Sequence, residues 1–169
     1  MIPTSKNIER VFLIKGDPNA GKTTTAAKLF KKLSDDRYAG TQIKLVEQSG
    51  NLLEVNSFTV KEAKQPDFCA IITVKGKTIA CLSMGDKWGV VWDWLKKLFE
   101  KAGCKIDILI GCCRRKGSGT YNGYHSEFDN SNVEIWSLKK ISDKEPAKSR
   151  EARENAFADL MYKAICDIL

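Results

Sequence analysis

The chain has 169 residues, 43% of them hydrophobic, which is enough to bury one core without disulfides or a structural metal, so we expect a single domain over residues 1–169. Its 28 Lys and Arg residues against 21 Asp and Glu residues give a net charge of +7, which suits a protein that attracts polyanions. The basic residues are spread along the chain without a recognisable nucleic-acid-binding module, so nucleic acid is a possible partner but a less favoured one than a small polyanion.

The polar residues 1–10 come before an all-apolar run at 11–14. This run is too short for the core of a signal peptide or for a membrane span, so we expect a cytoplasmic protein that has no membrane partner. Its composition is instead typical of a short buried strand.

A glycine-containing octet, GDPNAGKT at 16–23, follows this strand directly and opens an amphipathic helical stretch. Binding a polyphosphate requires converging backbone N–H groups, glycines where a Cβ would block the anion, and a helix N-terminus aimed at the charge. Gly16 and Gly21 have the required separation, Lys22 can reach the β- and γ-phosphates, and the Thr23 hydroxyl can bind Mg²⁺. The octet therefore predicts a phosphate-binding loop.

The octet resembles the Walker A motif of P-loop nucleoside triphosphatases, and its wording is most similar to the GTPase and dynamin-like branches. The resemblance implies the P-loop fold, with Mg²⁺ as cofactor and ATP or GTP as ligand. It also implies that the nucleotide is held by the loop and the first residues of the helix, namely Gly16, Asp17, Pro18, Asn19, Ala20, Gly21, Lys22, Thr23 and Thr24.

Apolar periodicity and turn residues predict the remaining elements. They are helices over 22–34 and 88–102, strands over 43–46, 68–74, 78–82, 106–113 and 133–138, a turn or loop at 48–51, a loop at 117–120, and a C-terminal helix after a capping box at Ser142 and Glu145. The polarity of residues 50–66 indicates a weakly ordered or exposed segment. Residues 75–77 predict an antiparallel hairpin. Because strands alternate with helices, we expect a three-layer α/β domain with a mostly parallel sheet and an antiparallel edge strand, whose ligands bind beyond the carboxyl ends of the strands.

Asp86 follows the strand at 78–82, where a carboxylate would lie near bound phosphates and Mg²⁺. Together with Gly89 it reads Asp-Lys-Trp-Gly, which resembles the Asp-x-x-Gly motif of GTPases. The resemblance implies that Asp86 and Thr23 hold the metal. Asp86 could also cap the following helix, and both roles could hold at once.

The next strand runs into Cys112-Cys113-Arg114-Arg115 where GTPases carry Asn-Lys-x-Asp. Arginine has only donors and cannot accept the protons of guanine, so the choice between ATP and GTP stays open. We predict that Arg114 and Arg115, with Lys22, supply catalytic positive charge, with a merely solvated basic loop as the alternative.

The six cysteines have no Cys-x-x-Cys spacing, which predicts reduced core thiols. The adjacent pair Cys112-Cys113 could be redox-active or bind a metal, but successive strand residues point to opposite faces. His125 could act as a general base, although a lone histidine is more often structural.

The leading hypothesis is a domain that binds and hydrolyses Mg²⁺-ATP or Mg²⁺-GTP. The alternative is a small kinase that passes the γ-phosphoryl group to a nucleotide or metabolite, with segments 50–66 and 114–123 closing over the acceptor. A second alternative is a non-catalytic module that keeps a nucleotide as a structural ligand and binds a protein partner.

Overall fold

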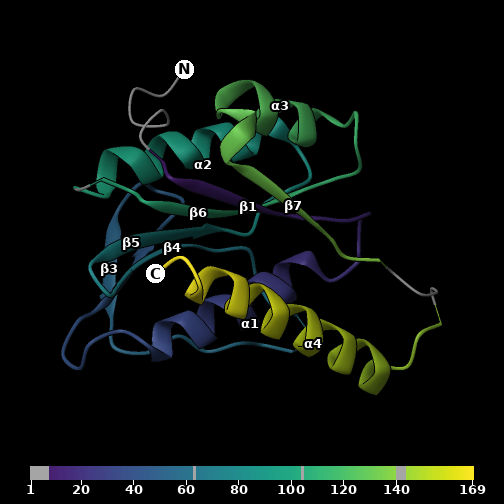
Figure 1. Ribbon diagram of the computed structural model, residues 1–169, viewed down its shortest axis with the longest axis horizontal. Coiled ribbons are helices and arrows are strands. Elements are labelled where there is room, and N and C mark those ends of the chain that lie inside the picture. The colour runs from purple at the N-terminus through teal and green to yellow at the C-terminus, as the bar shows by residue number, and fades with distance from the viewer. Residues whose placement is uncertain (1–7, 63, 104, 140–143) are drawn as a thin grey trace.

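The computed structural model describes residues 8–62, 64–103, 105–139 and 144–169. Within these ranges, seven strands form one sheet in the order β3-β2-β4-β5-β6-β1-β7 (Figure 1). The elements are β1 (Arg10–Lys15), α1 (Lys22–Asp35), β2 (Ile43–Val46), β3 (Leu52–Val55), β4 (Cys69–Val74), β5 (Lys77–Leu82), α2 (Trp88–Lys101), β6 (Ile108–Cys113), α3 (Gly119–Glu127), η2 (Asn130–Asn132), β7 (Val133–Ser137) and α4 (Ala147–Cys166).

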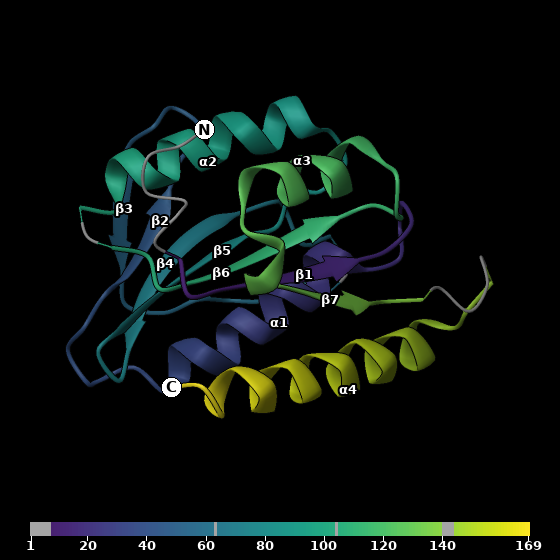
Figure 2. The same cartoon turned by 45° about the horizontal axis from the view of Figure 1, so that its top comes forward.

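Helices cover both faces of the sheet, with α1 and α4 on one face and α2 and α3 on the other (Figures 1 and 2). Strand β1 shows why both faces are apolar. Phe12 and Ile14 belong to the core beneath α1 and α4, whereas Val11 and Leu13 belong to the core beneath α2 and α3. This alternation is the ordinary period of a strand, so β1, which pairs with β6 and β7, is buried on both faces of the sheet.

The sheet combines a parallel half with an antiparallel half. Strands β5, β6, β1 and β7 pair in parallel, whereas β3, β2, β4 and β5 pair antiparallel, so three of the six strand pairings in the described residues are antiparallel. The predicted α/β class is confirmed, but the mostly parallel sheet with a single antiparallel edge strand is not. The connections β2–β3 and β4–β5 are too short for the crossover that a parallel pair needs.

Three elements, β3, α3 and the three-residue 3₁₀ helix η2, were not predicted from the sequence. Strand β3 has only four residues at the sheet edge, and so short an apolar run does not identify a strand by itself. Helix α3 contains two glycines and has no apolar stripe. Its first turn is set instead by Ser118, whose hydroxyl accepts a hydrogen bond from Tyr121 N at 3.2 Å.

Helix α4 begins at Ala147, after Pro146, without a side-chain cap. The predicted capping box is not testable because Ser142 lies outside the described residues. The buried stripe of α4 consists of Glu154, Ala158, Met161 and Ile165, whereas Leu160 is 58% exposed. Because Glu154 is charged, apolar periodicity alone does not predict this buried stripe. None of the helices in the described ranges is long and apolar enough to cross a membrane.

The contact between α2 and α3 yields a stability prediction. A Cβ on Gly123 would lie 2.1 Å from the Trp88 ring, so Gly123→Ala must push the two helices apart and should lower the free energy of unfolding by about 1–3 kcal/mol. Denaturant unfolding measures this change. Gly119→Ala is the matched control, because its Cβ meets nothing within 4 Å, and the variant should be as stable as wild type. Equal unfolding midpoints for the two variants would refute the packing argument.

Candidate functional site

The loop between β1 and α1 presents backbone donors at the carboxyl edge of the parallel strands. Asn19 and Gly21 have positive φ angles of 63° and 95°, while Ala20 between them does not. Such alternation turns neighbouring N–H groups toward one concave side. The N–H groups of Gly21, Lys22 and Thr23 have no acceptor within the described part of the chain. They are the open donors of the α1 N-terminus, and an anion can satisfy them.

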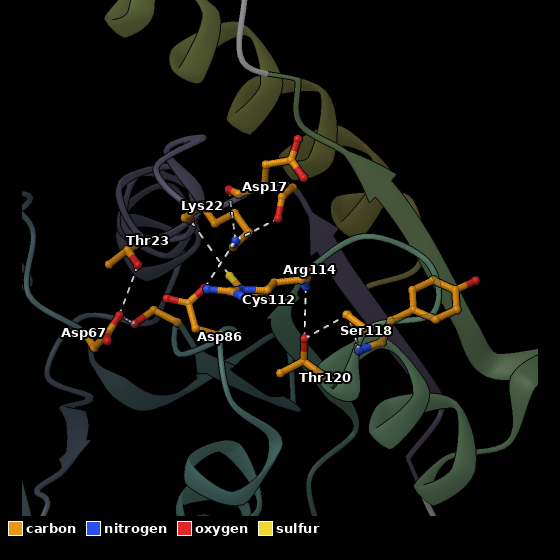
Figure 3. A network of polar contacts seen from close by, with 12 residues as sticks. Asp17, Lys22, Thr23, Asp67, Asp86, Cys112, Arg114, Ser118 and Thr120 are labelled. Atoms are coloured by element: carbon orange, nitrogen blue, oxygen red, sulfur yellow. Dashed lines mark hydrogen bonds and ion pairs between the residues drawn. The ribbon is translucent and has the colours of Figure 1, made fainter. Parts of the chain in front are cut away.

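The Lys22 side chain closes the loop. Its Nζ donates to Gly16 O at 2.8 Å and to Asp17 O at 3.2 Å, and lies 3.7 Å from Asp86 Oδ1 (Figure 3). The side chain is only 7% exposed, so the ammonium depends on these oxygens in place of water. The result is a fixed positive charge beside the open amides.

Asp86 reaches this charge because the chain passes tightly over the end of β6. A Cβ on Gly85 would lie 2.8 Å from the Cys112 backbone, so only glycine permits this path. Asp86 Oδ1 also accepts from Arg114 Nε at 3.2 Å. The N-cap of α2 is Lys87, so Asp86 does not cap this helix. Of the two residues that carry the Asp-x-x-Gly resemblance, Asp86 lines the cavity described below and Gly89 does not.

Asp67 is a site residue that the sequence analysis did not identify. Its Oδ1 accepts hydrogen bonds from Thr23 Oγ1 at 3.0 Å and from Ser83 Oγ at 3.2 Å (Figure 3). Asp67 comes just before β4, and Cys69 at the start of β4 pairs with Leu82 at the end of β5. The predicted hairpin could have identified Asp67, because the start of its first strand must lie beside the carboxyl end of its second strand.

These groups line a cavity of about 330 Å³. Its lining residues are Asn19, Gly21, Lys22, Thr23, Thr24, Asp67, Ser83, Met84, Gly85, Asp86, Lys87 and Val90. One wall carries the loop amides and the ammonium, and the other carries two carboxylates.

Not every predicted residue of the loop lines this cavity. Asp17 and Pro18 are exposed and border a second cavity of about 500 Å³, together with residues 114–118. Arg115 lines this second cavity but not the first, whereas Arg114 reaches back to Asp86. The structure therefore brings Arg114, and not Arg115, together with Lys22.

Two minor candidates lie elsewhere. His125 is on α3, where Nδ1 makes a 2.8 Å hydrogen bond with Tyr121 O and the ring stacks on the Tyr121 ring. It lines none of the cavities described here. Cys112 and Cys113 are buried on opposite faces of the sheet, so their predicted orientation is confirmed.

The first cavity can accept an anion on its amide wall and a divalent cation on its carboxylate wall. In the described residues, no three His, Cys, Asp or Glu side chains form a group that could hold a metal ion without further ligands. A cation here would need oxygens from the anion as well. Comparisons of the chain with protein-family models, curated proteins and solved structures find no match.

The buried cysteine pair gives a prediction about reactivity. Burial raises the pKa of the Cys113 thiol to about 11 and also raises the pKa of Cys112. Both thiols therefore stay protonated at pH 8, and only a thiolate attacks an alkylating agent. Iodoacetamide should modify half-buried Cys166 and leave Cys112 and Cys113 intact in the folded protein, as peptide mass spectrometry will show. All three should react in denaturant. Alkylation of the pair as fast as Cys166 under native conditions would contradict this expectation.

Proposed function

We propose that this chain is a P-loop domain that binds a nucleoside triphosphate, ATP or GTP, with Mg²⁺ and hydrolyses it. The observation that carries the proposal is one cavity with open loop amides and the Lys22 ammonium on one wall and Asp67 and Asp86 on the other. The parallel strands β5, β6, β1 and β7, with α1 after the loop, supply the framework expected for a P-loop fold.

The phosphates would bind at the N-terminus of α1. The amides of Gly21, Lys22 and Thr23 would donate to the anion, and the helix dipole would add to the attraction. Lys22 would exchange its contacts with the Gly16 and Asp17 carbonyls for phosphate oxygens. Because its ammonium is already held in place, this exchange needs little movement of the loop.

The residues that would hold Mg²⁺ are Thr23, Asp67 and Asp86. All three present oxygen atoms to the same cavity, and oxygen is the ligand that Mg²⁺ prefers. Mg²⁺ commonly binds through one or two carboxylates together with phosphate oxygens and water, which suits a site that holds two carboxylates. When bound, the ion would neutralise charge on the β- and γ-phosphates.

Arg114 is the arginine that would act on the reacting phosphoryl group, because it contacts Asp86 in the candidate site. It is tied to Asp86 by a half-exposed ion pair, and such pairs hold weakly. Recruitment of Asp86 to the metal would free the guanidinium to offset the charge of the transferring group. Arg115 borders the neighbouring cavity and is not assigned this role.

Phosphoryl transfer to an acceptor is a second candidate, favoured by the cavity beside Pro18. Arg114, Arg115 and Lys116 line it, so it suits an anionic acceptor. Within the segment 50–66, residues 52–55 form β3 and Phe58 packs into the core. Phosphate release without an acceptor would support hydrolysis, whereas ADP formation only after adding a nucleoside monophosphate would support transfer. Binding without turnover would support the non-catalytic module.

Removal of the Lys22 charge tests the anion wall. Lys22→Ala should weaken binding of Mg²⁺-ATP and Mg²⁺-GTP by about ten- to a hundredfold, because each charged contact to phosphate is lost. Isothermal titration calorimetry measures both affinities. Lys31→Ala is the control, since Lys31 lies on the same helix and pairs with Asp35 at the surface. Wild-type affinity in Lys22→Ala would remove the basis of the proposal.

The carboxylate wall is tested by Asp67→Asn and Asp86→Asn, which keep side-chain shape and remove charge. Without Mg²⁺, each variant should bind ATP as tightly as wild type or more tightly, because a negative charge near the phosphates is gone. With Mg²⁺, each should bind about tenfold more weakly. The informative quantity is the ratio of affinities with and without Mg²⁺, and an unchanged ratio in both variants would exclude these residues as metal ligands.

A further inference from the structure

The C-terminal helix α4 contacts the phosphate loop from behind. It runs alongside α1 on the same face of the sheet (Figure 2). Arg153 on α4 donates to the carbonyl oxygen of Ala20 from both terminal nitrogens, at 3.4 Å and 3.5 Å. A residue more than 130 positions further along the chain therefore binds the loop backbone directly.

Arg153 is itself held in one orientation by Glu145. Its Nε donates to Glu145 Oε1 at 3.2 Å and one terminal nitrogen donates to Oε2 at 3.0 Å. The two side chains are only 17% and 5% exposed. This paired geometry fixes the plane of the guanidinium, so its remaining donors are aimed at Ala20.

The contact at Ala20 determines where the next amide points. In a planar trans peptide the carbonyl oxygen and the following N–H point in opposite directions. Since the Ala20 carbonyl is held toward α4, the Gly21 N–H is turned away from α4, and Gly21 lines the candidate phosphate cavity. The hydrogen bond on one side of the loop thus orients a donor on the other.

The neighbouring residue on α4 fits against the same peptide. Glu154 is 3% exposed, and its Oε2 lies only 2.2 Å from where a Cβ on Gly21 would stand. Its carboxylate lies 3.8 Å from the buried ammonium of Lys28 on α1. Glu154 therefore occupies the space that the missing side chain of Gly21 leaves, and the loop cannot shift toward α4 without displacing it.

We infer that Arg153 is a positioning residue for the phosphate loop, which orients the Ala20–Gly21 peptide so that its amide faces the anion. Glu145 holds Arg153 for this task. The inference rests on the proposed function for the identity of the ligand, but the orientation of the peptide is independent of it. The C-terminal helix is accordingly part of the site, although it contributes no side chain to the cavity.

The test compares Arg153→Ala with Arg150→Ala, which removes the same charge from an exposed position on the same helix. The first readout is the ¹⁵N–¹H resonance of Gly21 in ligand-free protein, and the second is calorimetric affinity for inorganic tripolyphosphate with Mg²⁺. Arg153→Ala should move the Gly21 resonance and weaken binding about tenfold, and Arg150→Ala should do neither. An unmoved Gly21 resonance, or wild-type affinity, in Arg153→Ala would overturn the inference.

Two further variants separate loss of the Arg153 contact from loss of charge or of folding. Arg153→Lys keeps the charge but loses the fork, so it should restore affinity only in part. If Arg153→Ala does not fold, Glu145→Gln, which weakens the hold on Arg153, should produce the same changes to a smaller extent, and wild-type behaviour would count against the inference. Failure of wild-type protein to bind tripolyphosphate would instead refute the proposed function, while the Gly21 resonance would still decide the peptide orientation.

Discussion

Open backbone donors at the first turn of α1 are the constraint on which the site depends. A helix leaves its first N–H groups without internal partners, and here those of Gly21, Lys22 and Thr23 open on a cavity instead of a side-chain cap. Asn19 and Gly21 have left-handed conformations, which turn neighbouring N–H groups toward one side of the loop. An unsatisfied donor costs free energy when it is shielded from water, so an anion that accepts hydrogen bonds from these groups would bind favourably.

Positive and negative side chains in the cavity are paired by contacts that a ligand could replace. Asp86 lies between the Lys22 ammonium and the Arg114 guanidinium, and its side chain is 60% exposed. Ion pairs this accessible to water contribute little to stability, so their partners can be replaced at low cost. A metal ion would draw Asp86 from both cations and leave their charge to the phosphates. The same three side chains can thus serve both a resting and a ligand-bound arrangement.

Local signals in the sequence predicted the loop and α1, while tertiary pairing decided the rest. The octet at 16–23 and the helical spacing after it depend only on neighbouring residues, so the predicted helix agrees with α1 to within one residue. Asp67 and Arg153 join the site through strand pairing and helix packing, which no short motif encodes. The parallel share of the sheet was likewise overestimated, because the turn after β2 joins it to the unpredicted edge strand β3 and extends the antiparallel half of the sheet.

The most direct test of the phosphate-binding loop is an NMR titration of the ¹⁵N-labelled protein with Mg²⁺-ATP. Amide protons that donate to phosphate shift strongly, so the largest changes should fall on Gly21, Lys22 and Thr23, with smaller ones at Asp67 and Asp86. Comparable shifts with Mg²⁺-GTP would agree with the absence of the guanine motif at the end of β6. If no resonance of the loop moves at saturating nucleotide, or if the changes fall on another surface, the loop does not bind the phosphates of the nucleotide.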